Sequence, residues 1–383
     1  MNNCHPYFSK AAAALLSLSM LSLTSCGMIE MRNAVHETTR GEADSTKMLA
    51  PAERVNEIEI RTETAENEAE IPEEAPKTVI SFAAAGDVRI DENIIADAAN
   101  RAAQGSTYSF LKIYSGIYRA IHDADVAVGN YSAAAAPYHC GDPAQTTPIE
   151  SLAALAELGF EVLDTTGADP SASYVREMAE YEIVNLHSSM TGVNAVRIVE
   201  KDGVTIAFLA AEGADMNTET IAYADSVSDL VVVSANWKSG ISDKHKKAIA
   251  GTLAEAGADI ILGSGTTLGG AEWIDTGDDT PSLAVYSLGN LVASADKAED
   301  LCGGILSLDI TLCEGKITLE NVCIDPIILH YGEGNRNYQI FELNSYTGEI
   351  SGMHAVKDLN AAALTEKVSS LLNDGFLPSD FRN

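Results

Sequence analysis

The chain contains few of the residue patterns that mark a known chemistry. Gly263–Gly265 followed by Gly269-Gly270 is rich in glycine, but it lacks the spacing and the lysine of a phosphate-binding loop. No Gly-x-Ser-x-Gly nucleophile elbow is present, and no Cys-x-x-Cys, which argues against a zinc ribbon or a thioredoxin-like motif. Acidic residues are so numerous that no pair of glycosidase carboxylates stands out. None of these patterns predicts an activity.

Cys26 carries the clearest local signal. Lys10 precedes an apolar run over residues 11–23, which suits the hydrophobic region of a secretory signal and is too short to span a bilayer comfortably. The run ends in Leu23-Thr24-Ser25-Cys26-Gly27, which looks like a bacterial lipobox. We expect Cys26 to be lipidated and the protein to be anchored to the cell membrane outside the cytoplasm. The alternative is an ordinary signal peptide with a chance cysteine.

Four further cysteines remain in a compartment that permits disulfides, namely Cys140, Cys302, Cys313 and Cys323. Four cysteines allow three pairings, and the sequence does not choose among them. A hairpin turning at Glu314-Gly315 would put Cys313 and Cys323 out of register as partners.

The composition combines ordinary hydrophobicity with a strong acidic excess. The 383 residues include 24 basic and 56 acidic side chains, for a formal net charge of −32. Such a surface repels phosphate backbones, so nucleic-acid binding is disfavoured. Residues 27–77 are polar and poor in large apolar side chains, which predicts a disordered acidic spacer after the signal at 1–26. The spacer would hold the domain away from the membrane, or serve as a binding tail.

From Thr78 onward, apolar strand patterns alternate with helical ones, which predicts an α/β core with helices on both faces. A helix is expected from Ser242 to Gly257, and a second with a capping box at Thr147–Glu150 and Pro148 at its first position. Lys201-Asp202-Gly203 is typical of a hairpin turn. Residues 305–331 are expected to add antiparallel strands. The expected domain spans 78–333, with a C-terminal extension over 334–383.

Several segments together resemble the CapA family of poly-gamma-glutamate capsule synthesis proteins. Gly86-Asp87 after an apolar strand and Tyr286-Ser287-Leu288-Gly289-Asn290 are the most distinctive. The matching segments, in chain order, are Ser81–Asp87, Asp123–Asn130, Leu155–Leu163, Gly203–Leu209, Leu230–Ser234, Gly257–Gly263 and Tyr286–Asn290. The resemblance implies a calcineurin-like metallophosphoesterase fold, a layered α/β sandwich with added antiparallel strands, whose metal ligands lie at the carboxyl ends of the strands.

The ligand positions that the resemblance implies are mostly lost. Asp87 keeps the first of them. The family's Asn-Leu-Glu, Asn-Asn-His, His-Trp-Gly and Gly-His-His-Pro-His fall on residues 130–132, 167–169, 236–238 and 263–267, where no histidine occurs. Hydroxyls and glycine do not replace imidazole as ligands for transition metals. The candidate cleft residues are therefore Asp87, Asn130, Asp169, Asn236, Lys238 and Thr267, with Asp87 the one carboxylate retained at a family ligand position.

Each of these residues also has a structural interpretation. Asp87 caps a turn or binds a ligand, and Asp169 before Pro170 fits a helix N-cap better than a ligand. Lys238 is an ordinary solvated lysine, or it places an ammonium where a metal charge would sit. Asn290 is expected to satisfy backbone groups in its loop, and Trp237 to pack in the core or line a cleft.

The leading hypothesis is a non-catalytic, membrane-tethered CapA-like protein without a cofactor. It would act as a binding or scaffold component in capsule, poly-gamma-glutamate or cell-envelope polymer assembly, with envelope or capsule-synthesis proteins as partners. The alternative is a metal-dependent phosphoesterase-type hydrolase in which Asp87, Asn130, Asp169 and Asn236 hold a divalent cation such as Mg²⁺ or Ca²⁺. A small-ligand-binding lipoprotein is the third class.

Overall fold

The computed structural model describes residues 77–132, 135–136, 147–167, 172–212, 218–237, 240–278, 280–372 and 375–381. The chain divides into two units, Met1–Glu70 and Ile71–Asn383, and the described residues all belong to the second. The predicted signal, the lipidation site and the spacer up to residue 76 lie outside the described residues, as do Cys140, Asp169 and Lys238, whereas Lys77, the last residue of the predicted spacer, begins β1. None of the described helices combines the length and the apolar character needed to cross a membrane.

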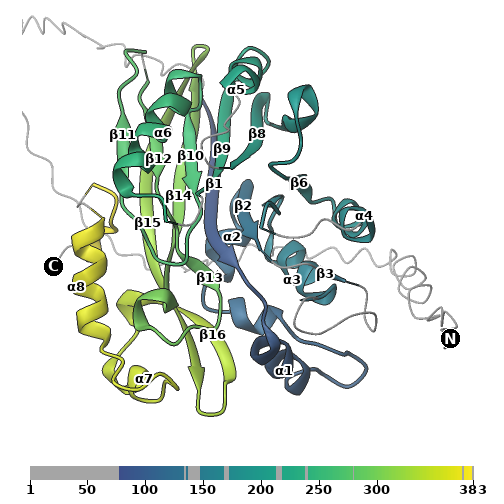
Figure 1. The fold of residues 1–383 in the computed structure, drawn as a ribbon, viewed down its shortest axis with the longest axis vertical. Coiled ribbons are helices and arrows are strands. Elements are labelled where there is room, and N and C mark those ends of the chain that lie inside the picture. Colours follow the sequence, from purple (N-terminus) through teal and green to yellow (C-terminus); the bar gives the residue numbers. More distant parts are fainter. Residues whose placement is uncertain are drawn as a thin grey trace, which may run out of the picture. The chain divides into compact units, whose positions relative to one another are not determined.

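Two β-sheets form the centre of the second unit (Figure 1). One has the order β16-β15-β14-β1-β2-β5-β6, with β13 paired to β1, and the other has the order β11-β12-β10-β9-β8-β7. β3 (Ala135–Ala136) and β4 (Thr147–Pro148) pair with each other as a separate two-stranded sheet. The strands of the larger sheet are β1 (Lys77–Val88), β2 (Val126–Tyr131), β5 (Val162–Asp164), β6 (Val184–Leu186), β13 (Asn290–Val292), β14 (Cys302–Cys313), β15 (Lys316–Gly332) and β16 (Arg336–Glu342). Those of the smaller sheet are β7 (Arg197–Lys201), β8 (Val204–Glu212), β9 (Leu230–Asn236), β10 (Ile260–Gly263), β11 (Ala271–Ile274) and β12 (Ser282–Val285).

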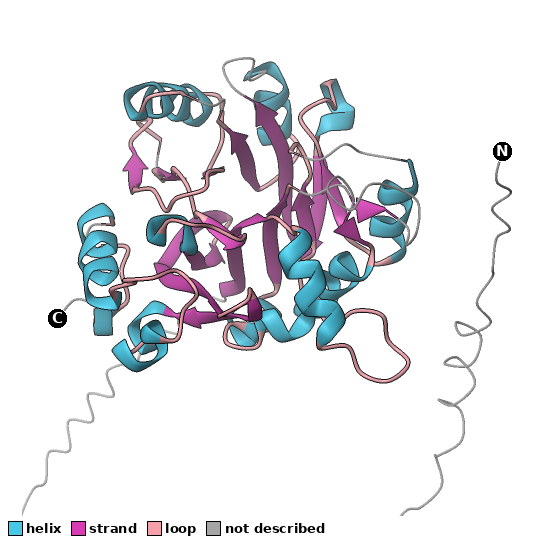
Figure 2. Cartoon of the chain, turned by 60° about the horizontal axis from the view of Figure 1, so that its bottom comes forward, coloured by secondary structure: helices cyan, strands magenta, loops and turns pink. Residues whose placement is uncertain are grey.

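The sheets pack face to face, and helices cover their outer sides (Figure 2). The helices are α1 (Glu92–Asn100), α2 (Tyr118–His122), α3 (Glu150–Leu158), α4 (Ala172–Glu180), α5 (Thr218–Asp225), α6 (Asp243–Glu255), α7 (Gly348–Gly352) and α8 (Ala361–Leu371). In β9, Leu230 and Val232 join the core between the sheets, while Val231 and Val233 join the core beside α5 and α6. Side chains alternate along a strand, so a fully apolar strand can serve both layers. The predicted layered α/β fold is confirmed.

The predicted antiparallel addition and its turns are confirmed as well. Strands β14 and β15 pair antiparallel and turn at Glu314-Gly315, and β7 and β8 turn at Asp202-Gly203. Both turns have positive φ at both central residues, the conformation that a two-residue hairpin requires. Cys313 lies opposite Lys316 and Cys323 opposite Ser307, so the two cysteines are out of register as predicted.

The predicted capping box at Thr147–Glu150 is wrong. Thr147 and Pro148 form β4, and α3 begins at Glu150 after Ile149, which makes no side-chain cap. The Thr147 hydroxyl instead donates to the carbonyl of Ile90, which lies before α1. Thr147 therefore hydrogen-bonds a residue distant in sequence, although the local pattern predicts that it caps the helix.

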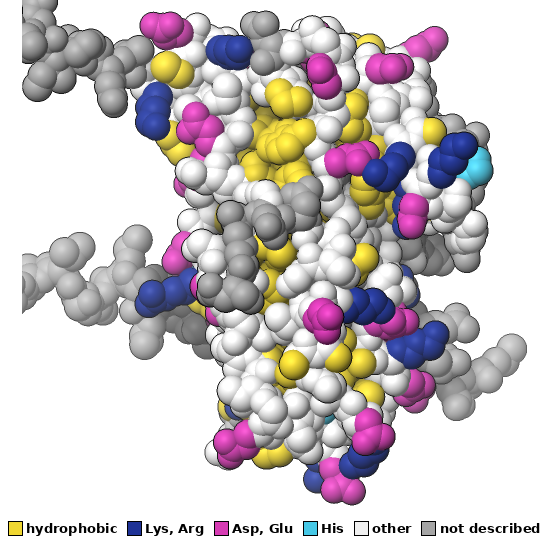
Figure 3. Space-filling view, turned by 90° about the vertical axis from the view of Figure 1, so that its left-hand side faces the viewer, with side chains coloured by type: hydrophobic (Ala, Val, Ile, Leu, Met, Phe, Trp, Pro, Cys, Tyr) yellow, Lys and Arg dark blue, Asp and Glu magenta, His cyan; other side chains and the backbone are white. Residues whose placement is uncertain are grey.

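The C-terminal segment packs against strands of both sheets. Phe376 lies beside Trp273 of β11, with ring centroids 6.3 Å apart, and its carbonyl accepts the backbone N–H of Ile324 in β15. On this face of the molecule, apolar side chains gather between acidic and basic ones (Figure 3). Residues 334–372 and 375–381 therefore add β16, α7 and α8 to the same compact unit.

Candidate functional site

The carboxyl ends of three neighbouring parallel strands bring Asp87, Asn130 and Asp164 into one row. Asp87 pairs in register with Asn130, and Asn130 with Asp164. Strand β9 of the other sheet ends in Ser234 to Asn236 and faces this row through side-chain contacts. This is where α/β sheets place their ligand sites. The row and the end of β9 define the candidate cleft.

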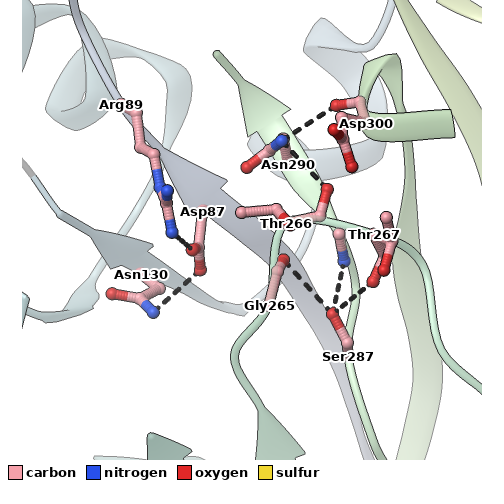
Figure 4. A network of polar contacts seen from close by, with 10 residues as sticks. Asp87, Arg89, Asn130, Gly265, Thr266, Thr267, Ser287, Asn290 and Asp300 are labelled. Carbon is pink, nitrogen blue, oxygen red and sulfur yellow. Dashed lines mark hydrogen bonds and ion pairs between the residues drawn. The ribbon is translucent and has the colours of Figure 1, made fainter. Parts of the chain in front are cut away.

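Asp87 is an almost fully buried carboxylate, with 2% of its surface exposed. Asn130 Nδ2 donates to Oδ1 at 2.9 Å, and Arg89 Nη2 makes an ion pair with Oδ2 at 2.8 Å (Figure 4). Burial raises the pKa of Asp87, while the Arg89 guanidinium opposes that rise and Asp164 adds to it. The chain thus supplies its own cation to this acid.

Asp164 is completely buried and accepts four hydrogen bonds. Ser234 Oγ and Asn236 Nδ2 donate to Oδ2 at 2.5 and 2.6 Å, and the backbone N–H and hydroxyl of Thr166 donate to Oδ1 at 2.8 and 2.6 Å. Burial raises the pKa of Asp164, and these donors oppose the rise. Because Ser234 and Asn236 belong to β9, Asp164 links the two sheets across the cleft.

The space left at the cleft is small. A cavity of about 20 Å³ lies between the strand ends, which is room for about one water molecule. Its walls come from both sheets, namely Ala85, Gly86, Asp87, Val128, Gly129, Asn130, Ser234, Leu262, Gly263, Ser264 and Leu288.

Gly86 allows β13 and the loop before it to approach Asp87 closely. A Cβ atom at Gly86 would lie 2.0 Å from the carbonyl oxygen of Gly289, whose own φ is +66°. The backbone N–H of Asp87 donates to that same oxygen at 2.9 Å. The Gly-Asp and Ser-Leu-Gly-Asn segments thus meet as backbone neighbours. Asn290 Nδ2 donates to the carbonyls of Thr266 and Asp300, the backbone-satisfying role that was predicted (Figure 4).

The other predicted residues lie in the cleft, on its rim and beside the core. Asn130 and Asn236 lie in the cleft, where their amide nitrogens donate to Asp87 and Asp164 respectively. Thr267 is exposed on the loop after β10, where its carbonyl accepts from Ser287 Oγ. Trp237 is partly buried and packs against the core beside α6, the first of its two predicted roles, and donates from Nε1 to the carbonyl of Tyr286.

Three residues of the cleft, Arg89, Asp164 and Ser234, are not among the residues predicted from the sequence, and the first two had a usable signal. Arg89 is two residues after Asp87, and side chains two apart in an extended chain point to the same side. Asp164 is the first acidic residue after the apolar residues Val162 and Leu163, three positions before the segment that resembles the family's ligand loop. The resemblance instead places a ligand position on residues 167–169 and so favours Asp169.

One model of a known protein family matches part of the sequence. Residues 183–295 match the model described as bacterial capsule synthesis protein PGA_cap. The match covers less than a third of the chain. The matched region contains Ser234 and Asn236 but does not reach Asp87, Asn130 or Asp164. No curated protein matches the sequence.

Solved structures similar to this chain include a phosphatase from Mycoplasma pneumoniae, with 12% identity, a TM-score of 0.46, and coverage of 66% of this chain and 95% of the other. A hypothetical protein from Thermus thermophilus has 15% identity and a TM-score of 0.42, with coverage of 64% and 98%. The calcineurin-like phosphoesterase YfkN from Bacillus subtilis has 10% identity and a TM-score of 0.38, with coverage of 77% and 98%.

The residues of the cleft do not fit the pair of divalent cations that the family resemblance implies. Two-metal hydrolysis needs several carboxylate, imidazole and amide ligands converging on ions about 3.5–4 Å apart. The cleft offers Asp87 and Asp164, and both already accept bonds from the chain's own donors. Within the described ranges, no three His, Cys, Asp or Glu side chains are grouped so that they could hold a metal ion. The described residues of the cleft therefore lack the donor set of a two-metal hydrolase.

Proposed function

We propose that this protein acts outside the cytoplasm as a non-catalytic binding or scaffold component in the assembly of capsule, poly-gamma-glutamate or another envelope polymer. The observation that carries the proposal is the state of Asp87 and Asp164, whose oxygens are bonded to Arg89, Asn130 and residues of β9. A hydrolase needs such oxygens free to hold cations or a reacting water. The PGA_cap match supports the connection with capsule synthesis.

The charge of the chain favours a protein partner over direct grasp of an anionic polymer. With a formal net charge of −32, the surface repels polyglutamate. A scaffold that holds synthesis proteins at the membrane avoids this repulsion. Envelope or capsule-synthesis proteins are therefore the proposed partners.

Membrane attachment through Cys26 is part of the proposal, and the sequence pattern supports it. Two acyl chains hold a protein stably at a bilayer where one does not. Replacing Cys26 by Ser should move the protein from the membrane fraction to the soluble fraction in cell fractionation. An unchanged distribution would refute the anchor.

Genetic complementation tests the scaffold role. In cells whose own gene for this chain is deleted, wild-type protein and Asp87→Asn should both restore the surface polymer, measured by its extractable amount. Asp87→Asn keeps the shape of the side chain and removes the carboxylate that the alternative hydrolase requires. Failure of Asp87→Asn at wild-type protein levels, together with divalent-metal-dependent phosphodiester cleavage by the purified wild type, would establish the hydrolase instead.

A second candidate, binding of a small ligand, is favoured by one observation. A cavity of about 340 Å³ lies beside the end of β8, within the size range of small-molecule sites. Its walls include Ser188, Met190, Thr191 and Glu212. A purified protein whose thermal unfolding is shifted by a small molecule, with the shift lost in Glu212→Gln, would support this function.

A further inference from the structure

Arg89 is held in place by the backbone of the strands that surround Asp87. The Arg89 N–H donates to the carbonyl of Val292 in β13 at 2.7 Å. From there the side chain returns to Asp87, and it remains 47% exposed while the carboxylate is 3% exposed. The guanidinium therefore covers a buried acid from the solvent side without being part of the apolar core.

The two buried acids of the cleft are compensated differently. Asp87 has a cationic partner, whereas the four donors on Asp164 are all neutral. The two carboxylates are close enough for Asp164 to raise the pKa of Asp87. Among the described residues, removing the guanidinium would leave the two acids of the cleft without a cationic partner, and an uncompensated buried charge is strongly unfavourable.

Asn130 adds an oxygen that lacks a protein partner. Its Nδ2 donates to Asp87, while its Oδ1 is buried and makes no hydrogen bond. Rotation of the amide by half a turn exchanges the two atoms. That exchange is unfavourable beside an ionised Asp87 unless a cation lies between the two oxygens.

We propose that Arg89 is a built-in counter-ion that occupies the place of a metal ion at Asp87. Without its guanidinium, the cleft becomes a site for a single hard divalent cation. The protein ligands of that cation would be the Asp87 oxygen that the guanidinium releases and Oδ1 of Asn130, with the charge of Asp164 nearby, since Mg²⁺, Ca²⁺ and Mn²⁺ prefer carboxylate and amide oxygens. The small cavity leaves room for one ion rather than two. The inference concerns the same cleft as the proposed function and rests on its premise that the native cleft holds no metal pair.

The experiment compares thermal unfolding of full-length wild type and Arg89→Ala in chelator and with Mg²⁺, Ca²⁺ or Mn²⁺, and measures bound metal by elemental analysis. The wild-type midpoint should not respond to the cations. The Arg89→Ala midpoint should be lower in chelator and should rise by about 5 °C at cation concentrations near 100 times the dissociation constant. About one ion per chain should accompany that rise.

Three variants control the result. Arg89→Lys keeps the positive charge and should not respond to cations, whereas Asp87→Asn/Arg89→Ala should lose the response of the single variant. Arg176→Ala removes an exposed arginine on α4 and should behave as the wild type.

Either of two outcomes overturns the inference. One is a cation response of Arg89→Ala no larger than that of Arg176→Ala. The other is wild-type protein that binds stoichiometric metal through Asp87. The second outcome can occur without any phosphodiester cleavage, in which case the counter-ion inference fails and the scaffold proposal stands. If Arg89→Ala does not fold, the inference is tested by the metal content of the wild type and by the cation response of Arg89→Gln, which also lacks the guanidinium.

Discussion

The cleft and a cluster around His330 and His354 both bury titratable side chains, but they do so in opposite ways. His330 on β15 and His354 after α7 are 9% and 3% exposed, and their rings meet edge to face at 5.1 Å. His354 Nδ1 accepts the N–H of Val356, so Nε2 carries the proton that faces the carbonyl of Leu329. These imidazoles are neutral packing groups, surrounded by Tyr331, Phe341 and Tyr346.

The difference teaches that the position of a residue type matters more than its presence. The chain has eight histidines, yet its two buried ones in the described ranges lie in an aromatic cluster, while the cleft is built from Asp, Asn, Ser and Arg. Burial lowers the pKa of His330 to about 4, with His354 adding to the effect, and it raises the pKa of Asp87 and Asp164. Lowering the pH should therefore reduce the stability contributed by the histidine cluster and increase the stability contributed by the cleft.

The largest expected effect comes from removing the acid that joins the sheets. Asp164→Ala leaves the Ser234 and Asn236 side chains unpaired at a buried site and should lower the free energy of unfolding by about 3–5 kcal/mol. Equilibrium denaturation in urea measures this. The matched control is Asp229→Ala, because Asp229 likewise accepts a backbone and a hydroxyl donor from Thr205 but is exposed. It should cost less than about 1 kcal/mol, and equal costs for both variants would contradict a cross-sheet role for Asp164.

The histidine cluster should make the fold sensitive to acid. The folded-state pKa of His330 is about 4 against 6.5 for the unfolded chain, so the unfolded chain binds more protons between these values. The stabilising contribution of neutral His330 is then fully present above pH 6.5 and is lost as the pH falls toward 4, by up to about 3 kcal/mol. His330→Gln, which does not titrate and can still bond the Tyr346 hydroxyl, should flatten this part of the urea-denaturation profile. His122→Gln, at an exposed site, is the matched control.

The smallest effect is expected in the cleft and has the opposite sign. Because the folded-state pKa of Asp87 is raised above 3.8, the folded protein binds the proton first as the pH falls. The contribution of Asp87 to stability therefore increases as the pH falls from its folded-state pKa to about 3.8. Asp87→Asn should remove this gain. A profile of Asp87→Asn that parallels the wild type from pH 7 to 4 would show that Asp87 does not titrate differently on folding.

Local sequence patterns predicted those elements that are stabilised by neighbours in the chain. The helix from Asp243 to Glu255 follows Ser242 and ends before Gly257, whose φ is +105°. Its position could be predicted because start, apolar stripe and left-handed stop lie within one segment. The turns at Asp202-Gly203 and Glu314-Gly315 were predictable for the same reason. Thr147 was not, because its partner Ile90 lies 57 residues away.

By itself, the sequence determined the order of the hydrophobic runs that form strands, the acidic charge and the absence of histidine from the segments that resemble the family's ligand loops. Only the tertiary structure decided how the remaining acids are satisfied. Asp164 receives donors from Ser234 and Asn236, which are 70 and 72 residues away and belong to the other sheet. A buried carboxylate must find partners wherever packing places them, and no local pattern encodes that choice.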